Sequence, residues 1–226
     1  MRINDDLTKP VFLDAAAMDW VPSPAAGVDR RMLYREGAEV ARATSIVRYA
    51  VGSAFPAHVH SGGEEILVLS GTFQDEHGDY PAGSYFRNLP GTSHSPAAAE
   101  GCEIFVRLWQ FREGDHAQIV RRPGEGEVLP LPAGVLSSRL LFDDGAERVM
   151  IEDWEAGAAH VITNPRGLEV LVVAGRLEIG EVSLGPQGWG RLPAGLDLVA
   201  VAGPQGARVW IKDAPLQHAD ILTIPA

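Results

Sequence analysis

The chain has 226 residues, of which 46% are hydrophobic, so it can form one large globular domain or two smaller ones and is not a disordered protein. Its 30 acidic and 19 basic residues give a formal net charge of −11, which repels phosphates and argues against a nucleic-acid partner. The sequence contains no apolar run of about 18 residues and does not begin like a secretory signal, so we expect no membrane partner. The single cysteine, Cys102, excludes an internal disulfide and favours a cytoplasmic location.

Short strands are predicted throughout the first half. The 25 glycines and 16 prolines interrupt regular structure too often for long helices. A helix-like pattern is limited to 14–20 and does not extend over three turns. Runs of β-branched and aromatic residues predict strands at 11–14, 28–36, 43–50, 65–69, 85–87 and 102–111.

A domain boundary is predicted at 121–135, a segment with three prolines and three glycines. We therefore divide the chain into domains at 1–120 and 121–226. Further short strands are predicted in the second half at 139–142, 148–152, 169–173, 176–179, 199–201 and 209–212.

The two halves resemble each other when the first is shifted by 104 residues. Glu65 then falls on Glu169, Gly71 on Gly175 and Gly91 on Gly195, and the run 104–107 falls on 208–211. EILVLSG matches EVLVVAG in the same alignment. The repeat predicts a duplicated all-β barrel.

A cluster of potential metal ligands lies in the first half. His58 and His60 are two residues apart, so on a strand both imidazoles project from one face. Ser61-Gly62-Gly63 permits a sharp turn that returns Glu64 to the same neighbourhood, and His94 follows a Pro-Gly turn. The expected ligands are His58, His60, Glu64 and His94. They suit one divalent ion, whether Zn, Fe, Mn, Ni or Cu.

Glu65 competes with Glu64 but lies one residue along, on the opposite face of the strand. Its counterpart Glu169 persists in the second half, which favours a structural role for Glu65. The ligand positions of the second half hold Ile162, Asn164, Leu168 and Leu198, and His160 has no partners of ligand type. We therefore predict a metal-free second domain that packs against the first or shapes an apolar pocket.

Several residues allow more than one interpretation. The metal could serve only to stabilise the barrel. An arginine, tyrosine or tryptophan on a neighbouring strand could line the pocket or lie on the outer face: Arg48, Tyr49, Arg87, Arg107 and Trp109. We interpret Cys102 as a small buried residue and the remaining histidines, His77, His116 and His218, as surface residues.

The motifs resemble those of the cupin superfamily. The pattern G-x5-H-x-H-x3-E-x6-G from Gly52 to Gly71 matches the first cupin motif, and Pro90-Gly91-x2-His94 resembles the second, although its proline directly precedes the glycine. The sequence of residues 62–94 is similar to that of ChrR-type cupins. The resemblance implies two tandem cupin barrels (double-stranded β-helix, or jelly roll) and a metal held by His58, His60, Glu64 and His94.

The resemblance also implies a function. The ChrR-type namesake is an anti-sigma regulator with a zinc-binding N-terminal helical domain, which is not expected here because its cysteines are missing, and this weighs against direct binding of a sigma factor. We expect a regulatory bicupin that binds a small molecule or senses an oxidant, and a homodimer. The alternatives are a metal-dependent dioxygenase acting on a β-diketone or flavonol-like substrate, and a bicupin whose metal is structural only.

Overall fold

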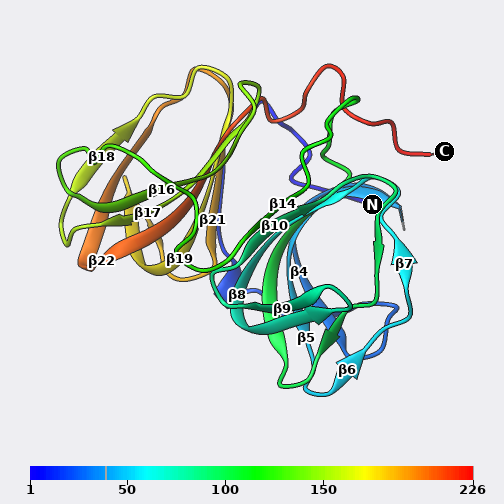
Figure 1. The fold of residues 1–226 in the computed structure, drawn as a ribbon. Coiled ribbons are helices and arrows are strands. Elements are labelled where there is room, and N and C mark those ends of the chain that lie inside the picture. Colours follow the sequence, from blue (N-terminus) through cyan, green and yellow to red (C-terminus); the bar gives the residue numbers. More distant parts are fainter. Residues whose placement is uncertain (39, 226) are drawn as a thin grey trace. The chain divides into compact units, whose positions relative to one another are not determined.

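The computed structural model describes residues 1–38 and 40–225. These residues form β-strands connected by turns, with one short 3₁₀ turn at Ala15–Ala17 (Figure 1). The prediction of an all-β fold is therefore confirmed, and the helix-like pattern at 14–20 is reduced to that single turn. Within the described residues, no helix has the length and apolar character needed to cross a bilayer.

Two compact units make up the chain. The first comprises Met1–Asp5, Asp19–Gly124 and the segment from Gln217 on, and the second comprises Asp6–Met18 and Glu125–Leu216. Their boundary after Gly124 falls inside the predicted linker at 121–135. The units differ from a simple division at residue 120, because one N-terminal segment belongs to the second unit and the C-terminal segment belongs to the first.

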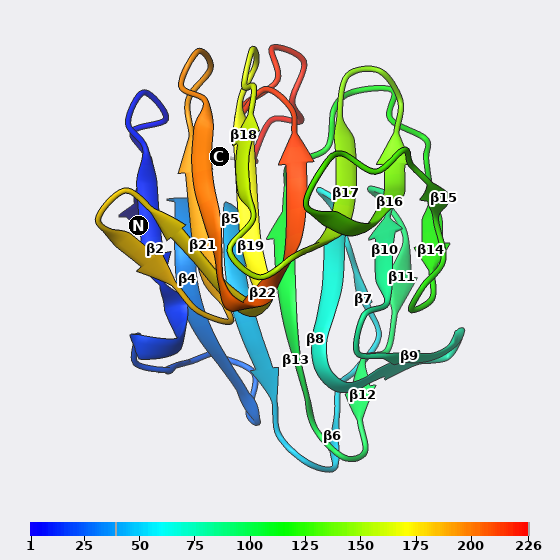
Figure 2. The ribbon, with the colours of Figure 1, turned by 90° about the vertical axis from the view of Figure 1, so that its left-hand side faces the viewer.

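Backbone pairing explains both exceptions. Strand β2 (Val11–Asp14) pairs with β21 (Gly188–Leu192) and forms the edge of the second unit's sheet, in dark blue in Figure 2. In the first unit, the amide of Leu222 donates to the carbonyl of Phe111 over 3.0 Å, and Arg42 donates to the carbonyl of Leu222 over 2.9 Å.

The first unit is built on one long antiparallel sheet. A separate two-stranded ribbon, formed by β7 (His58–Val59) and β11 (Ser93–His94), carries two of the predicted ligands. The sheet follows the order β1 (Arg2–Ile3), β4 (Val28–Gly37), β5 (Ala41–Tyr49), β13 (Cys102–Leu108), β8 (Glu64–Asp75), β10 (Tyr85–Asn88) and β14 (Ile119–Arg121). Shorter strands join it at β3 (Val21–Pro22), β6 (Ser53–Ala54), β9 (Gly78–Pro81) and β12 (Ala97–Ala98).

The second unit repeats this arrangement with fewer interruptions. Two pairs of predicted strands are each continuous, because 169–173 and 176–179 both lie in β19, and 199–201 and 209–212 both lie in β22. The order is β15 (Glu127–Val128), β16 (Val135–Asp143), β17 (Arg148–Trp154), β22 (Leu198–Asp213), β19 (Leu168–Ile179), β21 and β2, with β18 (Ala159–Ile162) and β20 (Val182–Leu184) alongside. The two tandem cupin barrels predicted from the sequence are thus present.

Equivalent glycines mark the repeat. Gly71 and Gly175 both have positive φ, at 68° and 72°, and a Cβ on either would collide with the carbonyl of Gly101 or Gly206. The alignment at a shift of 104 needs one correction beyond this point. Arg107 pairs with Glu65 whereas Lys212 pairs with Glu169, so the last strands align at a shift of 105.

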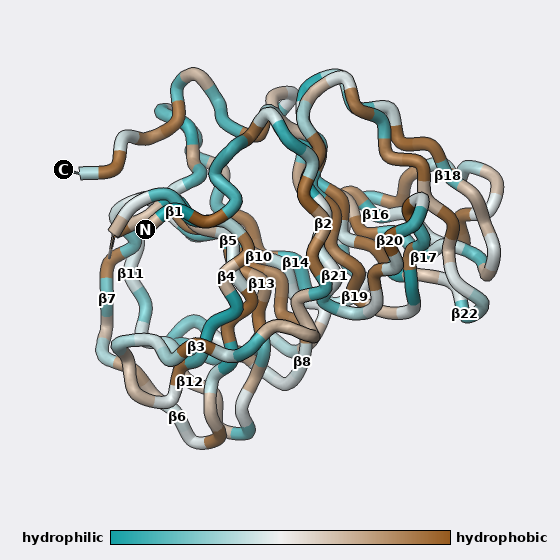
Figure 3. Tube along the Cα trace, turned by 180° about the vertical axis from the view of Figure 1, so that it is seen from behind, coloured by the Kyte–Doolittle hydropathy of each residue, from teal (hydrophilic) through white to brown (hydrophobic). Residues whose placement is uncertain are grey.

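Hydrophobic residues concentrate along central strands of each unit, as the brown segments of β13 and β19 show (Figure 3). The first unit's core includes Val47, Ile66, Phe73, Phe86 and Ile104, all of which are buried. Burial of these side chains stabilises the barrel that positions the predicted ligands, at about 25 cal/mol per Å² of apolar surface removed from water.

Candidate metal centre

The predicted ligands converge from three places in the first unit. His58 and His94 are directly opposite each other in the β7–β11 pair, and His60 lies two residues beyond His58. Gly63 follows with φ of 71°, a conformation that favours glycine, and the chain then enters β8 at Glu64.

The side-chain atoms of the three histidines lie close enough to bind one ion. One ring nitrogen of each lies within 4.8 Å of those of the other two. Oε1 of Glu64 is 3.4 Å from Nε2 of His60 and 3.5 Å from Nε2 of His94. The structure therefore brings together all four residues predicted as ligands.

Hydrogen bonds at Nδ1 orient each imidazole. Nδ1 of His58 is 3.4 Å from the carbonyl oxygen of Pro56, and Nδ1 of His94 is 3.2 Å from Oδ2 of Asp75, so both nitrogens act as donors. Nδ1 of His60 lies 3.1 Å from the hydroxyl of Thr92, which itself donates to the carbonyl of Leu89 over 2.7 Å.

These contacts fix the tautomers. The Thr92 hydroxyl has one proton and donates it to Leu89, so its oxygen accepts a proton from Nδ1 of His60. With Nδ1 protonated, Nε2 of each neutral ring carries the free lone pair. Asn88 donates to Oε1 of Glu64 over 2.9 Å and orients this carboxylate in the same way.

Burial keeps His60 and His94 in the neutral state that a cation requires. Burial, followed by the neighbouring histidine charges, lowers the pKa of His60 to about 3, and burial also lowers the pKa of His94. Burial raises the pKa of Glu64 to about 7. Nε2 of His60 is buried without a hydrogen-bond partner among the described residues. An unsatisfied lone pair beside a carboxylate and two further imidazoles fits a divalent ion.

A cavity of about 360 Å³ opens beside this cluster, within the usual range for small-molecule sites. His58, His60 and Glu64 line it. Apolar and aromatic side chains form part of its wall, namely Val47, Tyr49, Ile104, Val106, Leu108 and Trp109. Among the residues for which the sequence does not decide between the pocket and the outer face, Tyr49 and Trp109 line the cavity.

The arginines of the cavity differ from those considered in the sequence. Arg48 pairs with Asp29 at 2.7 Å, and Arg87 pairs with Asp115 at 2.6 Å; neither of these arginines lines the cavity. Arg30 and Arg35 line it instead. Strand periodicity does not predict that Arg30 and Arg35 share a face, since residues five apart normally face opposite sides of a strand.

A β-bulge brings the two arginines to one face. Arg30 pairs with Val47 and Arg35 with Ala43 on β5, and the register shifts between Met32 and Tyr34. The extra residue restores equal parity, because Val47 and Ala43 are four residues apart.

Trp109 reaches the cavity through an unusual backbone conformation. Its φ is 58°, in a region that costs about 1–3 kcal/mol for a residue with a side chain. The indole packs against Gly62, where a Cβ would overlap the ring. The two glycines of the turn thus serve different purposes, since Gly63 supplies the positive φ and Gly62 makes room for Trp109.

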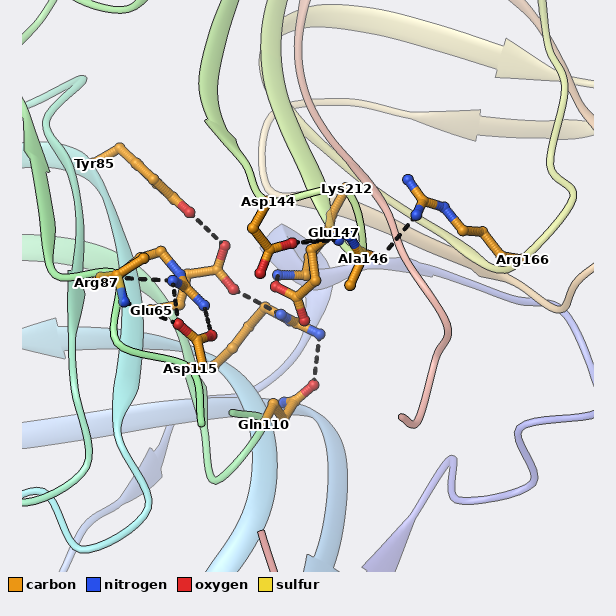
Figure 4. A network of polar contacts seen from close by, with 12 residues as sticks. Glu65, Tyr85, Arg87, Gln110, Asp115, Asp144, Ala146, Glu147, Arg166 and Lys212 are labelled. Carbon is orange, nitrogen blue, oxygen red and sulfur yellow. Dashed lines mark hydrogen bonds and ion pairs between the residues drawn. The ribbon is translucent and has the colours of Figure 1, made fainter. Parts of the chain in front are cut away.

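Glu65 faces away from the histidines, as strand parity predicts. Its carboxylate accepts hydrogen bonds from the hydroxyl of Tyr85 and from Arg107, each over 2.7 Å, and Arg107 also donates to Gln110 (Figure 4). The second unit has corresponding contacts. Trp189 donates to Glu169 over 3.2 Å, and Lys212 is buried in an ion pair at 2.6 Å from Glu147.

In the second unit, apolar side chains occupy three of the four positions that correspond to the ligands, and an asparagine occupies the fourth. Leu168 and Leu198 are buried in its core, and Ile162 packs against that core. Asn164 is buried at the position of His60 and donates to backbone carbonyls, including that of Pro193 at 2.8 Å. His160 stacks on Trp154 with ring centroids 4.2 Å apart.

Fold and site together define a class of structure: the chain has the cupin fold that solved structures share. Residues 8–112 match the family described as the ChrR Cupin-like domain. A search of curated proteins found no match.

Solved structures share the fold across nearly the whole chain. A candidate dioxygenase from Nostoc punctiforme is 16% identical with a TM-score of 0.70, over 97% of this chain and 88% of that one. The bacterial pirin YhhW from Escherichia coli, in complex with nickel(II), is 15% identical with a TM-score of 0.68, over 92% of this chain and 99% of that one. Oxalate decarboxylase OxdC from Bacillus subtilis is 14% identical with a TM-score of 0.65, over 93% of this chain and 78% of that one.

Proposed function

We propose that the first unit holds one divalent metal ion through Nε2 of His58, His60 and His94 and the carboxylate of Glu64. The observation that carries this proposal is the common tautomer, since each Nδ1 has a hydrogen-bond acceptor and each Nε2 is left for a cation. The metal can be Zn, Fe, Mn or Ni, because imidazole and carboxylate ligands suit all of them.

The metal site supports small-molecule chemistry better than a purely structural role. Four protein ligands leave coordination positions open on an ion that accepts five or six, and the cavity provides space beside them. The apolar part of the wall can contact the hydrocarbon of a bound molecule, and Tyr49 and Trp109 can pack against a planar one.

We propose that the reaction at this site is a dioxygenase reaction on a small enolisable molecule such as a β-diketone or a flavonol-like compound. A bound divalent metal supplies Lewis acidity toward an enolate and a position for O₂. Glu64, whose pKa of about 7 reflects its burial, is held by Asn88 at the edge of the cavity.

Oxygen uptake by the Fe(II)-loaded protein tests the reaction. We expect at least one member of a panel of β-diketones and flavonols to stimulate O₂ consumption, and His94→Ala to lower that rate by about 100-fold or more, because it loses a metal ligand. A protein that carries one metal ion per chain but consumes no O₂ with any panel member would contradict the oxygenase proposal and leave the metal site intact.

A regulatory function is the second candidate, and the match of residues 8–112 to the ChrR Cupin-like domain favours it. In that case the metal-loaded protein binds a small molecule or reacts with an oxidant without turnover, in the cytoplasm. Deletion of the gene should then change stress-induced transcripts, and unchanged transcripts would count against a regulator.

A further inference from the structure

Strands β5 and β13 form one side of the cavity beside the histidines. The described residues of these two strands that line it are Ala41, Val47, Tyr49, Ile104, Val106 and Leu108. Among these six, Tyr49 alone has a polar side-chain atom, its hydroxyl. This side of the cavity therefore presents hydrocarbon with a single hydrogen-bonding group.

Regular strand pairing turns Tyr49 toward the cavity. It is the last residue of β5 and lies two residues after Val47, so both side chains project from the same face. Tyr49 pairs with Cys102 on β13 and Val47 pairs with Ile104, with no shift of register between the two pairs. Cys102 and Ile104 are both buried in the core of the first unit. The inward direction of Tyr49 thus follows from the sheet itself.

Aromatic neighbours hold the ring of Tyr49 in place. Phe55 and Phe73 both contact it edge to face, with ring centroids at 5.4 and 5.7 Å. Phe73 in turn lies 5.6 Å from the ring of His94, measured between centroids. A ring held by two neighbours keeps its hydroxyl at one position, in the same part of the barrel as the predicted metal ligands.

The hydroxyl of Tyr49 makes no hydrogen bond to any residue of 1–38 or 40–225, and its oxygen is not fully enclosed. By contrast, the hydroxyl of Tyr85 donates to Glu65 over 2.7 Å. Burial, followed by the negative charge of Glu64, raises the pKa of Tyr49, so its hydroxyl keeps its proton. A proton donor in apolar surroundings is unfavourable without an acceptor, and a molecule in the cavity can supply one.

We propose that Tyr49 recognises the molecule bound at the metal centre by donating a hydrogen bond from its hydroxyl to an oxygen atom of that molecule. The inference rests on the metal centre proposed above and narrows the class of molecule that the centre binds. An enolate or phenolate oxygen is the preferred acceptor, because hydrogen bonds to charged oxygens are the stronger ones. The rest of such a molecule contacts the hydrocarbon around Tyr49.

Binding of two probes to the Co(II)-loaded full chain tests this role, because the visible spectrum of Co(II) responds to its ligands. Acetylacetone binds a metal through oxygen, whereas metal-bound pyridine has no acceptor left for a hydroxyl. We expect Tyr49→Phe to weaken acetylacetone binding by about tenfold or more. Its affinity for pyridine should change by less than about twofold, because the variant keeps the aromatic ring.

Tyr85→Phe is the matched control. It removes the same atom from a tyrosine whose hydroxyl has an acceptor in the protein, Glu65, and which does not line the cavity. This variant should bind both probes as the wild type does. The metal content of every sample is measured in parallel by elemental analysis.

Each result decides a different point. Equal acetylacetone affinities in the wild type and Tyr49→Phe, equal losses for both probes in that variant, or no binding of acetylacetone to metal-loaded wild type would overturn the role of Tyr49. A wild type that holds no metal at His58, His60, Glu64 and His94 would instead overturn the metal centre itself.

Discussion

Arg107→Met is expected to destabilise the first unit by about 3–5 kcal/mol, because it removes the buried ion pair between Arg107 and the carboxylate of Glu65. Both side chains are almost fully buried, at 4% and 5% exposure, and their charged atoms are 2.7 Å apart. Tyr85 continues to donate to Glu65 but cannot neutralise it. Urea unfolding monitored by circular dichroism measures the change in the free energy of unfolding.

A pair on the surface of the same unit provides the control. Arg48 and Asp29 are 2.7 Å apart at 43% and 34% exposure, so Arg48→Met should cost only about 0–1 kcal/mol. Adding Glu65→Gln to Arg107→Met removes the buried charge with which Arg107 pairs in the wild type and should recover part of the loss. Equal losses of stability in Arg107→Met and Arg48→Met would show that burial does not set the strength of the Glu65–Arg107 pair.

His94→Ala is expected to weaken metal binding by about 100-fold or more and to abolish stabilisation by metal. An ion present at 100 times its Kd stabilises the folded state by about 2.7 kcal/mol, so the wild type should melt at a higher temperature with metal than without it. The variant should show no such difference in differential scanning calorimetry. Its loss is larger than that from removing a supporting hydrogen bond, which costs about 10–100-fold.

Two further variants separate ligand loss from a general effect of losing a histidine. Thr92→Val removes the acceptor at Nδ1 of His60 and should weaken the metal-induced shift without eliminating it. His116→Ala changes an exposed histidine and should leave the shift unchanged. A full shift in His94→Ala would contradict the assignment of His94 as a ligand.

The sequence predicts that these four side chains lie close together, because most of their arrangement is local. His58, His60 and Glu64 lie within seven residues of one another, so strand parity and a glycine turn place them, and the β7–β11 pair adds His94. Strand parity likewise places Glu65 on the opposite face, and the internal repeat favours a structural role for it. Its partner Arg107 comes from a distant strand, which periodicity does not pair with it.

Features that depend on long-range strand pairing cannot be predicted from the sequence. The bulge beside Leu33 moves Arg35 onto the face of Arg30, and no residue type in 28–36 signals it. Residues 6–18 belong to the second unit because β2 pairs with β21. An edge strand has no intrinsic preference for its neighbour, so the sequence does not predict this pairing. The inward position of Trp109 depends on a positive φ that tertiary packing enforces.

Elemental analysis of the purified full chain tests the central claim, the metal centre of the first unit, most directly. After reconstitution with Fe(II) or Zn(II) and removal of unbound ions, the wild type should hold about one metal ion per chain. The double variant His60→Ala/His94→Ala should hold none, because two of the three imidazoles are removed while the second unit retains its apolar core. An equal metal content in both proteins, or no metal in the wild type, would contradict the account.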